Sequence, residues 1–271
     1  MRVQIAMPCA VLSSSVEYFW LLEGSSHGRT KELALPDGSM ELVIDLREAR
    51  IPLSDRHGRV AIFGGAVVCG PHTEYFVIDN TDGQAVIGAH LKPGGAAALL
   101  ARTPASALCN ACVSPDDLWG RDAADLRDEL LYAATTAERF AILERFLLSR
   151  IALSRSPHRA VRLALDRLRR QPHHQSIAEA ARLTGLSHKG LIDAFKRDVG
   201  MGPKRFCRLL RFQQILQAVR REQSIAWPDL AAAGGYCDQA HMIREFQAFS
   251  GLSPTVYQAS GGRHAHHVSL P

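Results

Sequence analysis

The second half of the chain contains the same helical pattern twice, and this repetition limits its fold more than any other feature. In each copy a short helix, a turn containing glycine and a longer helix with one polar face follow one another. Each copy ends in Gly-x-x-Pro, at 200–203 and again at 251–254. One such helix pair is also compatible with an ordinary helical core, but two in tandem predict two helix-turn-helix units.

Local signals place the helices of both units. Ser176 and Glu179 form a capping box at the start of the first unit, and Gly185 permits the left-handed turn that ends its first helix. In the second unit we expect helices at 227–233 and 238–249 around a turn at 234–236. Residues 203–221 are expected to form a long helix that connects the two units.

Charge is distributed unevenly along the chain. Residues 1–150 carry 14 basic and 19 acidic side chains, a net charge of −5, whereas residues 151–271 carry 18 and 8, a net charge of +10. Such asymmetry indicates that the second half meets a polyanion. Because a helix on a helix-turn-helix frame fits the major groove, the expected polyanion is double-stranded DNA, with the two units about one turn (~34 Å) apart.

Polar side chains of the second helix in each unit are candidates for contacts with DNA. Base edges are read by side chains in the groove, while lysine and arginine hold phosphates. The candidates for base or near-base contacts are His188, Lys189, Asp193, Gln239, His241 and Arg244. The candidates for phosphate contacts or a supporting role are Lys196, Arg197, Lys204, Arg205 and Arg208. Arg211 extends this basic stripe, and Glu245 is expected to face outward or towards the rim.

The first ~120 residues read as strands and turns. Extended apolar runs occur at 41–45, 59–63, 66–69 and 75–78. Residues 76–91 are expected to form a hairpin around Asp82-Gly83. Strands without intervening helices favour a curled antiparallel sheet, a sandwich or a barrel. From Asp116 onward the apolar spacing becomes helical.

The sequence therefore predicts an α+β chain of two domains. A mainly β domain with a few helices, curled or barrel-like, is expected over 1–153, and an all-α tandem helix-turn-helix domain over 154–262. The boundary is the polar segment 154–157, which ends in a proline suited to starting a helix. The tail 263–271 has no periodic pattern and is expected to be disordered.

The cysteines suggest no metal site. Cys109 and Cys112 have redox or metal spacing, but no second close Cys/His pair accompanies them. One helical turn apart, they are expected to be small apolar core residues, with a thiol switch as the alternative. Cys237, near the start of a recognition helix, is interpreted as a packing residue or an incidental surface thiol.

The stretch from about Pro157 to Tyr257 resembles the DNA-binding domain of AraC-type transcription regulators. Residues 235–257 contain the aspartate, the aromatic and apolar core, Arg-x-Phe and Gly-x-Ser-Pro of the family's second unit. The first unit is similar at 185–196 and 203–206 but departs at two positions. Asp193 stands where a basic or neutral residue is commoner, and Gly190 weakens a helix by ~1 kcal/mol relative to alanine.

The N-terminal half is similar to an uncharacterised regulatory domain that often precedes this kind of DNA-binding module. The likeness lies in residues 35–38, 43–45, 88–95 and 117–120. The resemblance implies effector sensing, dimerisation or both, so a small-molecule effector and a second copy of the chain are candidate partners. RNA polymerase joins them if the protein is an activator.

The resulting hypothesis is a cytoplasmic, sequence-specific transcription regulator, activator or repressor, with no cofactor, enzymatic activity or membrane segment. Six scattered cysteines suit reduced thiols, and no run approaches the ~18 apolar residues of a membrane span. The alternative from another class is an enzyme, such as a DNA-repair alkyl transferase, with an accessory helix-turn-helix module. A nucleoid-type binder without sequence preference is the third hypothesis.

Overall fold

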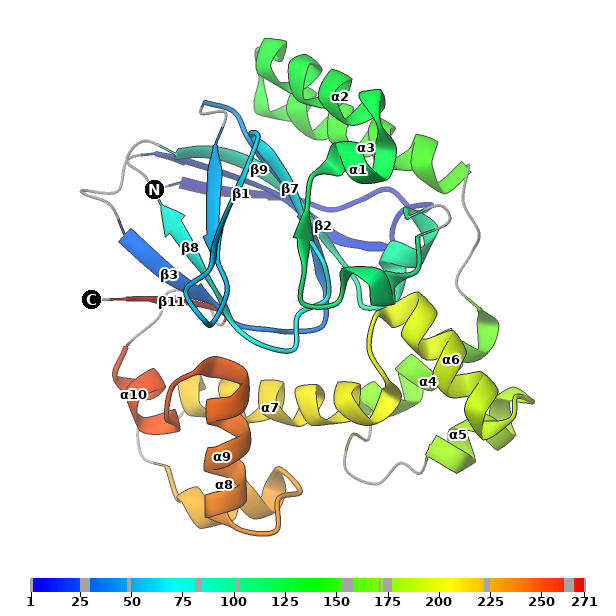
Figure 1. Ribbon diagram of the computed structural model, residues 1–271, viewed down its shortest axis with the longest axis vertical. Coiled ribbons are helices and arrows are strands. Elements are labelled where there is room, and N and C mark those ends of the chain that lie inside the picture. Colours follow the sequence, from blue (N-terminus) through cyan, green and yellow to red (C-terminus); the bar gives the residue numbers. More distant parts are fainter. Residues whose placement is uncertain are drawn as a thin grey trace.

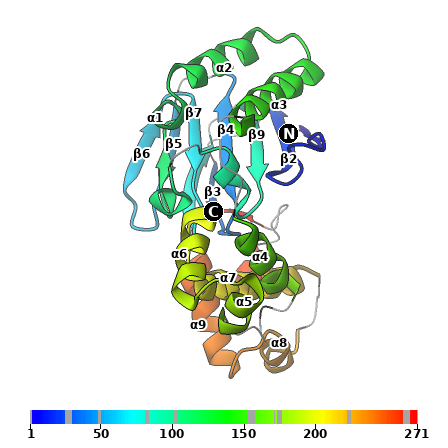
Figure 2. The same cartoon turned by 90° about the vertical axis from the view of Figure 1, so that its right-hand side faces the viewer.

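The computed structural model shows three tiers, seen from the front and the side in Figures 1 and 2. Helices α1–α3, within residues 115–152, lie at one end of the molecule, two β-sheets lie in the middle, and helices α4–α10, within residues 159–259, lie at the other end. The residues it describes are 2–24, 30–47, 50–80, 84–100, 103–152, 158–170, 172, 177–221, 225–260 and 266–270. The Asp82-Gly83 turn, the boundary at 154–157 and the capping Ser176 lie outside them, so these predictions stay untested.

The N-terminal domain is built on two antiparallel sheets. The larger has the order β1-β2-β9-β4-β7-β10 among the described residues, and the smaller has the order β11-β3-β8-β5-β6. The strands are β1 (Arg2–Ala6), β2 (Val16–Gly24), β3 (Thr30–Ala34), β4 (Met40–Asp45), β5 (Ile51–Ser54), β6 (Val60–Phe63), β7 (Ala66–Cys69), β8 (Phe76–Asn80), β9 (Gln84–Leu91), β10 (Cys112–Val113) and β11 (His267–Ser269). The predicted mainly β fold is confirmed.

The alternation of side chains along β4 explains why the sheets and helices stack. Met40, Leu42 and Ile44 are at most 3% exposed and belong to the core that includes the helices α1–α3. Val43 packs on the opposite face, against a small cluster with Leu53 of the other sheet. Because neighbouring side chains of a strand point to opposite faces, one strand serves both cores.

Three helices cover the larger sheet on the side away from the smaller one. They are α1 (Pro115–Trp119), α2 (Arg121–Tyr132) and α3 (Thr136–Ala152). Leu130, Leu143 and Leu147 are fully buried in the core beneath them. Two 3₁₀ helices, η1 (Gly95–Ala98) and η2 (Ala105–Leu108), precede them. The helical spacing that begins near Asp116 is therefore confirmed.

The predicted hairpin over 76–91 is wrong in its pairing. Both strands form, but β8 pairs with β3 and β5 in the smaller sheet, whereas β9 lies between β2 and β4 in the larger one. Residues 85–91 are buried throughout, so β9 takes the central position with the long strand β2 as a neighbour. Local turn signals cannot reveal this choice, because the pairing partners come from distant segments.

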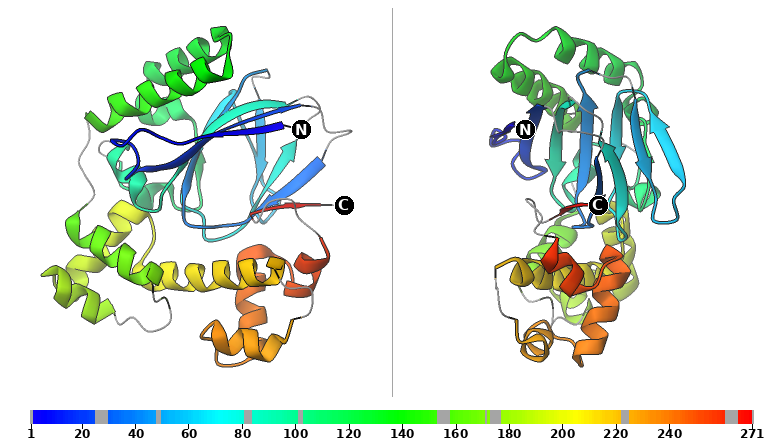
Figure 3. Two further views of the ribbon diagram at one scale, coloured as in Figure 1. Left: turned by 180° about the vertical axis from the view of Figure 1, so that it is seen from behind. Right: turned by 90° about the vertical axis from the view of Figure 1, so that its left-hand side faces the viewer.

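The C-terminal domain is helical, as predicted. Its helices are α4 (Arg159–Arg170), α5 (Ile177–Thr184), α6 (His188–Val199), α7 (Pro203–Arg221), α8 (Trp227–Ala233), α9 (Gln239–Ser250) and α10 (Pro254–Ala259). Figure 3 shows α7 running between the two units, with α4–α6 at one end and α8–α10 at the other. No helix in the described ranges is long and apolar enough to cross a lipid bilayer.

The two domains share one hydrophobic core along α7. Phe206 and Leu209 are fully buried, and a side chain added at Gly38 of the N-terminal domain would meet both. The Gln213 amide donates a hydrogen bond to the Pro36 carbonyl at 2.5 Å. Gly38 itself has φ 83°, the left-handed conformation that glycine adopts readily. The turn at 36–38 therefore seats α7 against the sheets.

Beside this turn lies a buried histidine that sequence reasoning missed. The imidazole nitrogens of His90 are 3.1 Å from Glu41 and 3.4 Å from Asp37, and the ring stacks on Tyr18. Burial, the largest single effect, favours the neutral ring, but the hydrogen bonds with Asp37 and Glu41 outweigh it and raise the pKa of His90 to about 11. A cationic His90 thus holds the turn beneath α7 in place.

The prediction of a disordered tail is wrong for residues 266–270. β11 pairs antiparallel with β3, and Val268 is 2% exposed in the same core as the helical domain. The edge of β3 offers unpaired backbone groups, and the short apolar segment satisfies them. A sequence without periodicity can still form a strand when such an edge is available.

Phe206→Ala should lower the free energy of unfolding by about 3–5 kcal/mol, because it opens a cavity at the junction of both domains. Urea denaturation of the purified chain measures this loss. The control is Tyr132→Ala, since Tyr132 is 90% exposed on α2 and its truncation should change stability by less than about 0.5 kcal/mol. Similar losses in both variants would contradict the shared core.

Candidate DNA-binding surface

The second helix of each helix-turn-helix unit, α6 or α9, begins and ends in the same way. Ser187 Oγ accepts a hydrogen bond from the backbone N–H of Gly190 at 3.0 Å, and Asp238 Oδ1 accepts one from that of His241 at 2.6 Å. Gly200 (φ 91°) and Gly251 (φ 73°) end the helices in the left-handed conformation. The duplication read from the sequence is therefore a duplication of capped helices.

Gly190 has a different meaning in the structure from the one its helix propensity suggests. It lies in the first turn of α6, where its backbone N–H donates a hydrogen bond to Oγ of the capping residue Ser187. A Cβ at this position would lie 3.1 Å from the Ser187 oxygen that accepts this bond. The residue therefore leaves room for the cap, and a penalty calculated for a helix interior does not apply in full.

The structure leaves the predicted base-contacting residues of α6 accessible. His188, Lys189 and Asp193 are exposed, and Lys196 one turn further along is exposed as well. The C-terminal end of α6 instead contacts η1 and η2 of the N-terminal domain, where Val199 lies beside Gly94 and Gly200 lies beside Ala105. Residues 188–196 of α6 thus present the polar groups that can meet a ligand.

On α9 the predicted residues differ in exposure. Arg244 is exposed, whereas Gln239 and His241 are half-buried. The His241 ring packs edge-on against Tyr236, with ring centroids 5.3 Å apart. Arg244 is therefore the most accessible candidate of the second unit.

Glu245 is buried, so the prediction that it faces outward or towards the rim is wrong. The residue is 7% exposed, and its carboxylate receives Arg208 at 2.5 Å and Arg211 at 3.5 Å from α7. The guanidinium of Arg211 also lies 5.0 Å above the Tyr236 ring. The helical periodicity of residues 238–249 gives no sign of this contact, because the carboxylate reaches across to arginines of another helix, far away in the sequence.

The predicted phosphate contacts fall into two groups: arginines that pair with a buried carboxylate, and cations that stay exposed. Arg208 is held by Glu245, and Arg197 pairs at 2.9 Å with Asp198, whose buried carboxylate also accepts from the His158 backbone N–H. Arg205 lies 3.9 Å from Glu74 of the N-terminal domain and is exposed, as is Lys204.

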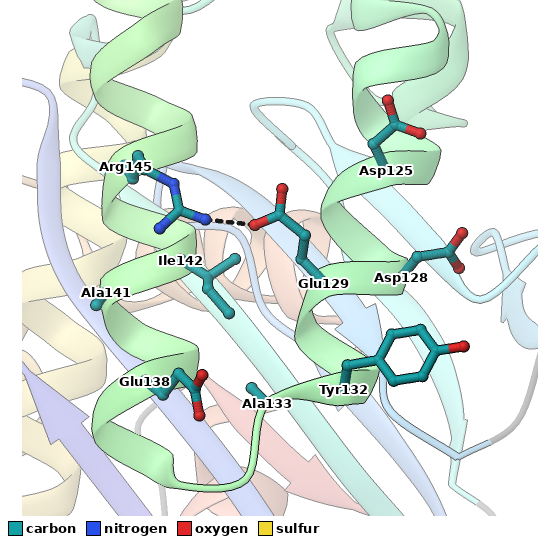
Figure 4. A pocket seen from close by; sticks show the side chains of 9 residues that line it. All are labelled: Asp125, Asp128, Glu129, Tyr132, Ala133, Glu138, Ala141, Ile142 and Arg145. Atoms are coloured by element: carbon teal, nitrogen blue, oxygen red, sulfur yellow. Dashed lines mark hydrogen bonds and ion pairs between the residues drawn. The ribbon is translucent and has the colours of Figure 1, made fainter.

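The opposite end of the molecule has the opposite charge. A hollow between α2 and α3, with a volume of about 540 Å³, is drawn in Figure 4. Four carboxylate residues line it, and Arg145 pairs with one of them; they are Asp125, Asp128, Glu129 and Glu138. Phosphates are repelled from such a surface, so a nucleic acid is directed to the helix-turn-helix end.

The family matches agree with this division of the chain. Residues 180–260 match the family described as a helix-turn-helix domain, and residues 4–114 match a domain of unknown function, DUF6597. The chain therefore joins a segment that matches this uncharacterised domain to a segment that matches a helix-turn-helix domain.

One curated relative is an uncharacterised HTH-type transcriptional regulator of Haemophilus influenzae. It is 30% identical over 98 residues, which are 36% of this chain and 33% of that protein. The chain thus matches about a third of the relative's length.

Solved structures resemble the chain in backbone arrangement. ToxT from Vibrio cholerae has 9% identity and a TM-score of 0.49, with 96% of this chain and 98% of that chain covered. An AraC-type DNA-binding protein from Chromobacterium violaceum has 17% identity and a TM-score of 0.36, with 38% and 93% covered. A probable AraC family regulator from Rhodopseudomonas palustris has 22% identity and a TM-score of 0.34, with 38% and 96% covered.

Glu245→Ala should destabilise the chain by about 3 kcal/mol, because it leaves two guanidinium groups facing a partly buried site without their carboxylate. Chemical denaturation measures the effect. The matched control is Glu129→Ala, which breaks the pair with Arg145 on an exposed surface, where both side chains are more than half exposed, and should cost less than about 1 kcal/mol. An equally small loss at Glu245 would refute the structural role.

Proposed function

We propose that the protein is a sequence-specific DNA-binding transcription regulator, in which α6 and α9 enter successive major grooves under the control of the N-terminal domain. The observation that carries the proposal is the pair of capped helices connected by the buried helix α7. A recognition helix reads bases with residues near its N-terminus, and the exposed part of α6 lies there.

The accessible side chains assign roles within this proposal. His188, Lys189 and Asp193 on α6 and Gln239, His241 and Arg244 on α9 are the candidates for base contacts. Phosphate contacts fall to the exposed Lys196, Lys204 and Arg205. Arg197 and Arg208 take the supporting role, since each is already paired with a buried carboxylate.

The N-terminal domain is placed to influence the DNA-binding helices. A cavity of about 450 Å³ is lined by Lys31, Arg56 and Tyr75 of the β domain and by Gly251 and Leu252 at the end of α9. A small molecule there would touch both domains and change their mutual packing. This cavity is our candidate effector site. Thermal-shift screening of small molecules against the unsubstituted chain and its Lys31→Ala variant tests it.

The matched families favour a regulator over an enzyme with an accessory module. Binding-site selection with the purified chain and genomic fragments tests the proposal. We expect one enriched motif with two half-elements about 10 base pairs apart, which is one turn of the duplex. Binding that random DNA competes away equally well would favour the nucleoid-type alternative.

Arg244→Ala should weaken binding to the selected motif by about 1–3 kcal/mol while leaving binding to random DNA nearly unchanged, because a base contact carries sequence information and a phosphate contact does not. Fluorescence anisotropy at fixed salt measures both affinities. Arg121→Ala serves as the control, since Arg121 is exposed on α2 at the far end of the molecule. An equal loss on both DNAs would make Arg244 a phosphate contact.

A further inference from the structure

Two cysteine side chains face one another where the two sheets pack together. Cys112 of β10 is the direct antiparallel partner of Cys69 of β7, and directly opposed residues point to the same face of a sheet. Their Sγ atoms are 3.1 Å apart, about 1 Å longer than the ~2.05 Å disulfide bond. Both are free thiols, packed against the cluster of Leu53 and Val67. The backbone thus already holds the two sulfur atoms next to one another.

A histidine makes the two thiols unequal. His72 Nδ1 lies 2.7 Å from the Gly70 carbonyl oxygen, which assigns the ring proton to Nδ1 and leaves Nε2, 4.0 Å from Cys112 Sγ, as an acceptor. The hydrogen bond with Cys69, and after it that with His72, lowers the pKa of Cys112 to about 6 despite burial. The hydrogen bond with Cys112 and burial raise the pKa of Cys69. Cys112 is therefore the nucleophile and Cys69 the neutral partner.

This pairing replaces the one that the Cys-x-x-Cys spacing suggests. Cys109 directly follows η2 with extended backbone, and Asn110 with φ 55° makes a turn between it and β10. Cys109 and Cys112 therefore do not lie one helical turn apart as expected. Burial raises the pKa of Cys109. The reactive geometry joins Cys112 to Cys69, a residue 43 positions away.

We propose that Cys112 and Cys69 form a modification site that hydroperoxides oxidise to a disulfide. The Cys112 thiolate attacks the hydroxyl oxygen of the peroxide; the O–O bond breaks and an S–O bond forms. The hydroxide or alkoxide that leaves takes up the proton that the Cys112 thiol released to solvent, and departs as water or an alcohol. The sulfenic acid of Cys112 then reacts with Cys69, forming the S–S bond and releasing water. Two thiols are oxidised by two electrons in total, and one peroxide is reduced.

The disulfide would form next to the contact between the domains. Pro71, two residues after Cys69, and Ala105 of η2 bracket Gly200 at the end of α6, where an added Cβ would lie 2.2 Å from Pro71 Cγ and 3.0 Å from the Ala105 carbonyl. Backbone hydrogen bonds from Gly70 to Ala111 and from Asn110 to Pro71 already join the two segments. The covalent bond therefore ties together the two segments that hold the end of α6.

Peptide mapping of the full chain after treatment with hydrogen peroxide at pH 7 tests the proposal. The chain is first reduced, the reductant removed, and unreacted thiols alkylated before digestion. We expect a peptide pair linked through residues 69 and 112, and several-fold faster loss of the Cys112 thiol than of the exposed Cys237 thiol. Linkage of Cys112 to Cys109, faster oxidation of Cys237, or no disulfide at all would overturn the proposal.

Variants separate the two roles. In Cys69→Ser the sulfenic acid of Cys112 should persist and be trapped by dimedone, whereas in Cys112→Ser the thiol at position 69 should stay reduced. Cys69→Ala, which buries no hydroxyl group, replaces Cys69→Ser if the latter does not fold. Cys109→Ser is the matched control and should form the same disulfide as the unsubstituted chain. None of these measurements involves DNA, so their outcome is independent of the proposed function.

Discussion

The burial of a single helix, α7, holds the molecule together. Phe206 packs edge-on against Phe195 of the first unit, Phe212 packs against Phe246 and Phe249 of the second, and the turn at 36–38 covers the remaining side. Because one continuous core serves all three neighbours, the two recognition helices cannot move apart without exposing apolar surface to water. The relative position in which the two recognition helices would meet DNA is therefore set by packing around α7. The same packing holds both helices against the N-terminal domain.

Charge organises the surface of this packed frame. The helical half carries the excess of basic residues, but part of that charge is neutralised within the fold. Glu245 forms ion pairs with two arginines, and Asp198 forms one with a third. Of the predicted phosphate contacts, Lys196, Lys204 and Arg205 remain exposed, and the acidic hollow between α2 and α3 lies at the far end of the molecule. Net charge alone points to a polyanion, but only the ion pairs separate the arginines that support the fold from those free to meet it.

The sequence predicted the structure correctly where the controlling interactions are short in range. The predicted bounds of α7 and α8 agree with the structure, and β7 coincides with the apolar run at 66–69, because periodicity, prolines and terminal glycines act within a few residues. It failed where the partner is distant. Residues 76–91 contribute strands to two different sheets, and residues 267–269 pair with the edge strand β3. Glu245 forms ion pairs with arginines more than thirty residues away.

The thiols show the same limit at a chemical site. The Cys-x-x-Cys spacing pairs Cys112 with Cys109, whereas the fold places Cys112 opposite Cys69 and beside His72. The sequence by itself determined the two-part organisation of the chain and the duplicated capped helices, since these depend on local hydrogen bonds and on the spacing of apolar side chains. Only the tertiary structure decided which strands pair, which charges are buried and which thiols meet, because those contacts join segments that no local pattern connects.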